Sequence, residues 1–109
     1  MRVIAGAGDC AAPAGVTWVE QLRVADLSVG TYCIPAGGTD EQSPHTEDEI
    51  YIVTAGRARL VAGGQEAEVR PGSVIYVPAD EVHRFTDIAE DLAVVVVFAP
   101  AEYSRAAEG

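Results

Sequence analysis

The sequence contains no lysine, so its positive charge comes from arginine alone. Seven basic residues stand against seventeen acidic ones, and the formal net charge at pH 7 is −10. A surface of this sign repels phosphate backbones and anionic lipids, which argues against nucleic-acid and membrane-surface binding. Because the acids are spread along the chain, we interpret them mainly as a solubilising surface.

Cysteine is also scarce, with only Cys10 and Cys33 present. Two irregularly placed cysteines cannot form a disulfide framework or a zinc knuckle, so reduced thiols are expected. A Cys10–Cys33 bridge stays open as the alternative. The N-terminus lacks an apolar signal-peptide core, and no stretch approaches the roughly 20 apolar residues of a membrane span. We therefore expect a cytoplasmic protein.

Helix signals are nearly absent from the chain. Short runs rich in valine, isoleucine and tyrosine alternate with turn residues, which predicts an all-β sandwich or barrel. A hydrophobic fraction of 49% over 109 residues suffices for one core, so we expect a single domain. Gly63-Gly64 marks the clearest hairpin. The expected strands are 16–19, 21–29, 31–34, 49–54, 58–62, 66–70, 73–77, 83–87 and 92–98.

The last expected strand, within "DLAVVVVFAP", is apolar at both alternating sets of positions. Both of its faces should therefore be covered, one by the core and the other by a second sheet or a second subunit. This pattern leads us to expect a homodimer. The tail that follows, "AEYSRAAEG", is expected to form a short helical turn or to fray.

Two segments each place a histidine beside a glycine or proline turn, and together they resemble the two motifs of the cupin superfamily. The first cupin motif reads G, five to seven residues, H-x-H, three or four residues, E, six residues, G. Gly56 matches its last glycine, Glu49 its glutamate and His45 its second histidine. The first histidine of the pair falls on Ser43, which departs from the motif.

The second cupin motif reads G, five residues, P-x-G, two residues, H, three residues, N. In "GSVIYVPADEVHRFTD", Gly72, Pro78 and His83 match it. Asp80 stands in place of the glycine and Asp87 in place of the asparagine. The spacing is therefore kept better than the residue types.

The resemblance covers roughly residues 20–99, and two independent spacings in the right order make it specific at the level of the fold. It implies an all-β, single-domain cupin barrel of the double-stranded β-helix or jelly-roll type. The N-terminal strand and the C-terminal tail would then be dimer contacts. By the same alignment, His45, Glu49 and His83 would hold a divalent metal such as Fe, Mn, Ni, Co or Zn.

The missing first histidine leaves three interpretations open. Gln42 or Glu47 could act as a fourth ligand, Ser43 could leave a water in the vacated position, or the site could have lost its metal and become a proton-transfer or binding pocket. Glu47 is the better acidic substitute, since it lies two residues from both His45 and Glu49 and thus on the same face of a regular strand. We favour metal retention.

Glu49 and Glu47 are also the candidate acid/base residues. Tyr51, Phe85 and Cys33 are candidate walls of a substrate pocket, although core packing explains each of them as well.

A cupin barrel does not by itself assign a chemistry, because the fold hosts several classes of enzyme and also binding domains. The leading hypothesis is a metal-dependent enzyme for a small molecule, with oxygenase chemistry in the barrel mouth. The second is a non-catalytic ligand-binding or sensor domain. The third is a metal-free isomerase or cyclase that uses His83 and a carboxylate for acid–base catalysis.

Overall fold

The computed structural model describes residues 1–10, 15–40 and 44–105, and these residues form strands and turns without a helix. No helix in these ranges is therefore long and apolar enough to cross a membrane. In chain order the strands are β1 (Thr17–Val24), β2 (Leu27–Ile34), β3 (Asp48–Ala55), β4 (Ala58–Ala62), β5 (Gln65–Val69), β6 (Val74–Val77), β7 (His83–Thr86) and β8 (Leu92–Ala99).

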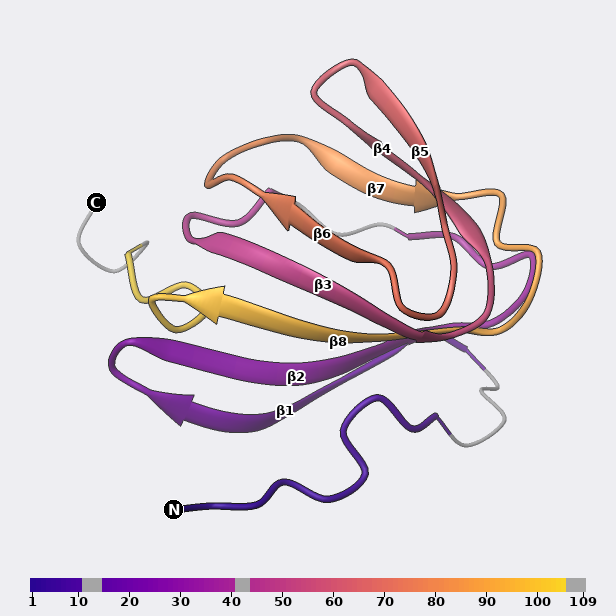
Figure 1. Ribbon diagram of the computed structural model, residues 1–109. Coiled ribbons are helices and arrows are strands. Elements are labelled where there is room, and N and C mark those ends of the chain that lie inside the picture. Colours follow the sequence, from indigo (N-terminus) through magenta and orange to yellow (C-terminus); the bar gives the residue numbers. More distant parts are fainter. Residues whose placement is uncertain (11–14, 41–43, 106–109) are drawn as a thin grey trace.

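The strands form two antiparallel sheets that enclose one core (Figure 1). One sheet has five strands in the order β1-β2-β8-β3-β6, and the other has three in the order β5-β4-β7. Ile34 and Val94 from the larger sheet meet Leu60 and Phe85 from the smaller one in a single hydrophobic cluster. The predicted all-β jelly-roll fold is confirmed.

The predicted division of residues 16–34 into the strands 16–19, 21–29 and 31–34 is wrong, because the structure has only two strands there, β1 and β2. The sequence pattern assigned residues 21–29 to one strand, but Ala25 and Asp26 form the turn of a hairpin between β1 and β2. Val24 and Leu27 are paired directly across this turn. The apolar residues on either side of Asp26 therefore belong to two facing strands, and only the aspartate marks the break between them.

Glycine is required at two places in the backbone, a hairpin tip and a close approach of two chain segments. Gly63 and Gly64 form the predicted tip of the β4–β5 hairpin with φ values of 55° and 77°, where side chains are rarely tolerated. Gly56 follows β3 with φ of 84°, and a Cβ there would lie 2.3 Å from the carbonyl oxygen of Asp91. The glycine that closes the first motif is thus required by the approach of two chain segments.

The expectation of reduced thiols is wrong, because Cys10 and Cys33 form a disulfide. The N-terminal segment is also fixed by Gly8, which donates its N–H to Thr31 Oγ1 at 2.9 Å and accepts the Thr54 hydroxyl at 2.8 Å. This segment covers part of the outer face of the larger sheet, where a second sheet or subunit was expected. The cytoplasmic location stays a prediction, without the support of free thiols.

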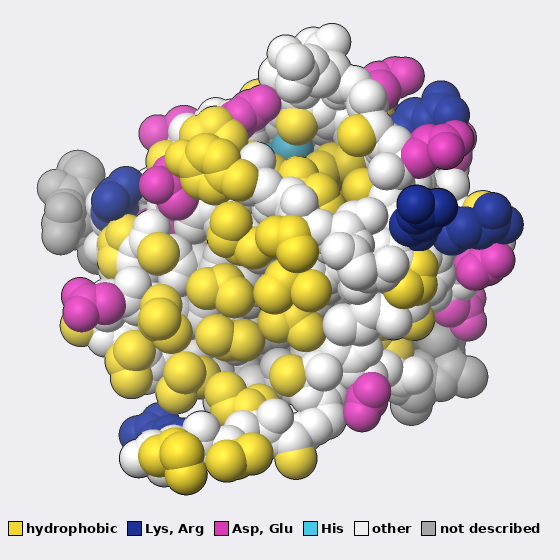
Figure 2. Space-filling view, viewed as in Figure 1, with side chains coloured by type: hydrophobic (Ala, Val, Ile, Leu, Met, Phe, Trp, Pro, Cys, Tyr) yellow, Lys and Arg dark blue, Asp and Glu magenta, His cyan; other side chains and the backbone are white. Residues whose placement is uncertain are grey.

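The rest of that outer face is apolar, and Figure 2 shows hydrophobic side chains gathered over β2, β8 and β3. Val95 and Val97 of β8 are only half-buried. Val19, Val74 and Tyr76 on neighbouring strands are exposed. The homodimer expected from the pattern of β8 stays a prediction.

Reduction of the Cys10–Cys33 disulfide should lower the free energy of unfolding by about 3 kcal/mol, because the bridge restricts the unfolded chain. Urea unfolding with and without a reductant measures this difference. The Cys33→Ser variant is the control, since its stability should not respond to the reductant. Equal responses of the wild type and the variant would contradict the expectation.

Candidate functional site

His45 lies in the loop that leads into β3, and its side chain is buried. Its backbone carbonyl accepts the N–H of Asp80 at 2.7 Å, which ties it to the loop between β6 and β7. The imidazole packs against the rings of Phe98 and Tyr103, with centroid separations of 4.5 Å and 5.1 Å. Both the backbone and the ring of His45 are therefore held in place.

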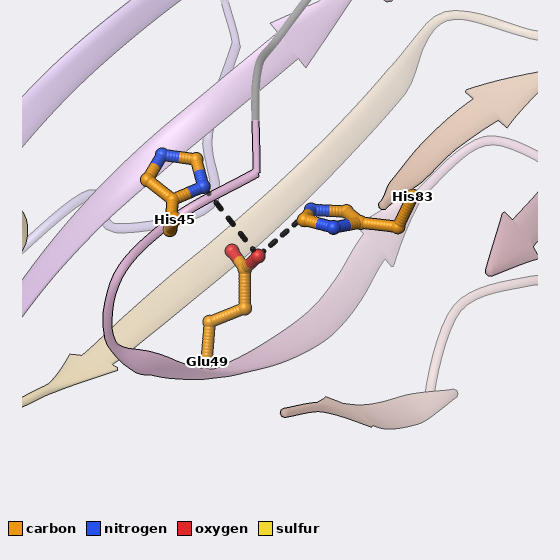
Figure 3. A group of neighbouring side chains, drawn as sticks. All are labelled: His45, Glu49 and His83. Carbon is orange, nitrogen blue, oxygen red and sulfur yellow. Dashed lines mark ion pairs between the residues drawn. The ribbon is translucent and has the colours of Figure 1, made fainter. Parts of the chain in front are cut away.

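Glu49 lies on the inner face of β3 and is 1% exposed. Its Oε1 is 2.8 Å from Nε2 of His83 and 3.7 Å from Nδ1 of His45 (Figure 3). Because His83 begins β7 of the smaller sheet, the contact with Glu49 joins the two sheets. The structure thus brings together the three residues that the motif spacing selected.

Hydrogen bonding determines how His83 is oriented. Its Nδ1 lies 2.7 Å from the carbonyl oxygen of Glu81 and donates to it, and its Nε2 lies 2.9 Å from the Tyr51 hydroxyl. Burial lowers the pKa of His83, but the contacts with Glu49 and Glu81 and the negative charges of Glu49 and Asp40 outweigh burial and raise that pKa. His83 therefore retains a proton more readily than an ordinary histidine.

Within the described part of the chain, the buried His45 Nδ1 and Glu49 Oε2 have no hydrogen-bond partner, and Glu49 Oε1 is paired with Nε2 of His83 at 2.8 Å. The ligand atoms of His45, Glu49 and His83 all lie within 4.8 Å of one another. Buried polar atoms are nearly always paired, so unpaired atoms that converge require an explanation. Two imidazoles and a carboxylate suit a divalent transition metal. This trio could therefore hold a metal ion.

Glu47, predicted as a substitute ligand and acid/base residue, instead holds the C-terminal turn. Its Oε1 accepts the N–H of Tyr103 at 2.6 Å and its Oε2 accepts the N–H of Arg105 at 3.0 Å. Burial raises the pKa of Glu47, but these hydrogen bonds and one from a threonine hydroxyl outweigh burial and lower it. Its oxygens are occupied, and it is not a member of the convergent trio. Gln42 and Ser43, the other predicted substitutes, lie outside the described residues.

Sequence reasoning missed Glu102, which lies in the turn after β8. Its Oε2 is 2.9 Å from Nε2 of His45, and its backbone N–H donates to Ser28 Oγ at 2.9 Å. The expected turn in the tail is present at residues 102–105, and it packs on the barrel. Glu102 belongs to neither cupin motif. The sequence marks it only as an acidic residue shortly after the last strand.

A cavity of about 260 Å³ opens beside His45. The Trp18 ring packs over Gly30 on the neighbouring strand, where a Cβ would lie 2.2 Å from the indole. Aromatic walls with few polar groups suit a small, mostly apolar molecule. The residues that line the cavity are Trp18, Tyr32, His45, Val96, Phe98, Glu102 and Tyr103.

The three residues predicted as pocket walls do not line this cavity. Tyr51 and Phe85 are buried in the core, with ring centroids 4.9 Å apart, and Tyr51 reaches the site through its hydroxyl. Cys33 is held in the disulfide. Its neighbours Tyr32 and Ile34 belong to the core cluster, so strand alternation turns Cys33 to the outer face.

Known proteins resemble this chain in both sequence and structure. A family model described as "Cupin domain" matches residues 30–99. The uncharacterized protein SCO3923 of Streptomyces coelicolor is 48% identical over 85 residues, which cover 78% of this chain and 81% of that protein.

Two solved structures illustrate the likeness of the fold. KdgF from Halomonas sp. matches with a TM-score of 0.72 at 20% identity, over 84% of this chain and 85% of that one. An RmlC-like cupin family protein with a double-stranded β-helix fold, from Methanocaldococcus jannaschii, matches with a TM-score of 0.72 at 18% identity, over 81% and 83%. At these identities the likeness shows the fold alone.

Replacing Glu47 by alanine should release the C-terminal turn, because the N–H groups of Tyr103 and Arg105 lose their acceptor. We expect the free energy of unfolding to fall by about 2 kcal/mol, as for hydrogen bonds to a charged group. Amide hydrogen exchange at Tyr103 and Arg105 should become faster. The exposed Glu68 provides the control variant Glu68→Ala, which should change neither quantity. Unchanged exchange at Tyr103 in Glu47→Ala would show that Glu47 does not hold the turn.

Proposed function

The chain belongs to the cupin family, and on that premise we propose that it is a metal-dependent enzyme acting on a small organic molecule. The observation that carries this proposal is the buried trio of His45, Glu49 and His83, whose ligand atoms converge and include His45 Nδ1 and Glu49 Oε2, which have no hydrogen-bond partner among the described residues. A buried carboxylate with an unpaired oxygen is unfavourable in free energy. A divalent cation held by these side chains would compensate the charge of Glu49 and use the free lone pairs.

The donor set indicates which metals and which chemistry are suitable. Two imidazoles and one carboxylate are the protein ligands of non-haem Fe(II) oxygenases, in which further coordination positions stay open. We therefore propose Fe(II) first, with Mn, Ni, Co and Zn as alternatives for the same donors. Such a metal supplies a Lewis acid and, in the case of iron, the O₂ chemistry of an oxygenase.

The chain's own residues prepare His83 for this role. The hydrogen bond from its Nδ1 to the carbonyl of Glu81 leaves Nε2 as the nitrogen that faces Glu49. Metal-ligating histidines commonly donate their other ring N–H to a backbone carbonyl, which fixes the tautomer and the ring orientation. The Tyr51 hydroxyl, 2.9 Å from Nε2, is placed to exchange a hydrogen bond with the same nitrogen.

We place the substrate in the cavity beside His45. Its volume of about 260 Å³ is at the small end for ligand pockets, which usually begin at roughly 300 Å³. The side chains of Trp18, Val96 and Phe98 provide apolar walls, whereas His45 and Glu102 provide ionisable groups. A molecule with a small hydrocarbon body and one polar end fits this distribution.

A metal-free isomerase or cyclase is the second candidate, and one observation favours it. Nε2 of His83 contacts both the Glu49 carboxylate at 2.8 Å and the Tyr51 hydroxyl at 2.9 Å. A buried imidazole beside a carboxylate can move a proton between two positions of a substrate by general acid–base catalysis. A ligand-binding or sensor protein would use the same cavity and would need neither the metal nor the proton transfer.

Metal content separates these candidates. Purified protein reloaded with Fe(II) under anaerobic conditions should hold close to one metal ion per chain, measured by elemental analysis after removal of free metal. His83→Ala and Glu49→Ala should each lose most of this metal, because each removes one of the three ligands. Glu68→Ala is the control, since it removes an exposed carboxylate and keeps every ligand.

Wild-type protein that stays free of metal after reloading with each of the five metals would overturn the metalloenzyme proposal in favour of the metal-free candidates. Full metal content in His83→Ala would instead show that the ligands lie elsewhere.

A further inference from the structure

We propose that Glu102 is a positioning residue, which keeps the proton of His45 on Nε2 and so leaves Nδ1 as the bare ligand atom of the trio. This inference rests on the proposed metal site. It assigns a role to a residue outside both sequence motifs, at a position 57 residues from the histidine that it contacts.

The assignment follows from the hydrogen-bonding capacities of the two groups. A neutral imidazole carries one N–H donor and one bare nitrogen, and an ionised carboxylate can only accept. The Glu102 carboxylate lies 2.9 Å from Nε2 of His45, so Nε2 is the nitrogen that carries the proton. His45 Nδ1 then has a free lone pair.

That free lone pair points at another acceptor. His45 Nδ1 is buried without a hydrogen-bond partner among the described residues, and it lies 3.7 Å from Oε1 of the Glu49 carboxylate. Two acceptors that face each other in a buried site repel unless a cation lies between them. The proton on Nε2 thus makes Nδ1 the atom of His45 that can share a cation with Glu49.

Several hydrogen bonds hold Glu102 in this position. Its backbone N–H donates to Ser28 Oγ at 2.9 Å, and its backbone carbonyl accepts from the Arg23 guanidinium at 2.9 Å. The next residues are held by the buried Glu47 carboxylate, which accepts the N–H groups of Tyr103 and Arg105. Glu47 therefore contributes to the site indirectly, by anchoring the turn that carries Glu102.

This arrangement resembles the carboxylate–histidine–metal triads in which an outer carboxylate fixes the tautomer of a ligating histidine. The first motif lacks one of its two histidines, and the carboxylate from the C-terminal turn acts through the histidine that is present. Loss of such an outer carboxylate typically weakens metal binding by about 10- to 100-fold.

The first test examines the tautomer in metal-free protein, so it does not depend on the proposed metal. Long-range ¹H–¹⁵N NMR spectra of protein labelled with ¹⁵N-histidine distinguish a protonated from a bare ring nitrogen, and His83→Ala assigns the two histidines. His45 of the wild type should carry its proton on Nε2 alone. Glu102→Ala should lose this preference, whereas Glu102→Gln should keep it because the amide oxygen still accepts.

The second test measures Co(II) affinity by titration. Glu102→Ala should raise the Kd by about 10- to 100-fold, and Glu102→Gln should restore much of the loss. Glu90→Ala is the matched control, because it removes the same charge from an exposed side chain paired with Arg57 and should leave the Kd unchanged. Thermal unfolding of the metal-free variants checks that each of them folds.

The outcomes separate this inference from the proposed function. A wild-type proton on Nδ1, or on both nitrogens, overturns the role of Glu102, as does an unchanged Kd in Glu102→Ala. Equal loss of binding in Glu102→Gln and Glu102→Ala, with the Nε2 proton retained in Glu102→Gln, would make Glu102 a direct ligand and overturn positioning. A wild type that binds no Co(II) counts against the metal site, while the NMR spectra still decide the tautomer.

Discussion

The contact between the Glu49 carboxylate and the His83 imidazole is the interaction on which the arrangement of this site depends. It connects β3 of the larger sheet to β7 of the smaller one across the core, at a distance of 2.8 Å. Desolvation of a carboxylate is costly, so its burial requires a compensating positive charge or several hydrogen bonds. The barrel places two imidazoles around Glu49, and in this way a core made mostly of valine, leucine and aromatic residues accommodates an ionisable cluster.

The chain buries a second carboxylate two residues earlier and satisfies it by different means. Glu47 receives two backbone N–H groups from the C-terminal turn, whereas Glu49 faces the imidazoles of His45 and His83, and its Oε2 has no hydrogen-bond partner among the described residues. One carboxylate is therefore a structural anchor, and the other is available to a ligand. Their sequence context is nearly the same, and the difference arises from which part of the chain packs over each of them.

The two substitutions in the second motif are explained by backbone conformation. Asp80 has a φ of 65° and Asp87 a φ of 50°, at the positions where the motif has glycine and asparagine. Glycine and asparagine are residues that enter this left-handed region most readily, and aspartate is also among those that tolerate it. Aspartate can therefore occupy both positions, one before β7 and one after it, and the N–H of Asp80 donates to the carbonyl of His45.

The sequence by itself determined the all-β fold and the trio of His45, Glu49 and His83, because strand alternation and motif spacing are local properties of the chain. The prediction from sequence missed the turn at Asp26, because the two strands on either side of it have similar apolar patterns. Only the tertiary structure decided the Cys10–Cys33 bridge, the hydrogen bonds of Glu47 and the contact of Glu102 with His45. The last of these joins positions 57 residues apart, and no local pattern encodes it. Such a contact exists only after the C-terminal turn has packed on the finished barrel, where the side chains it meets come from distant strands.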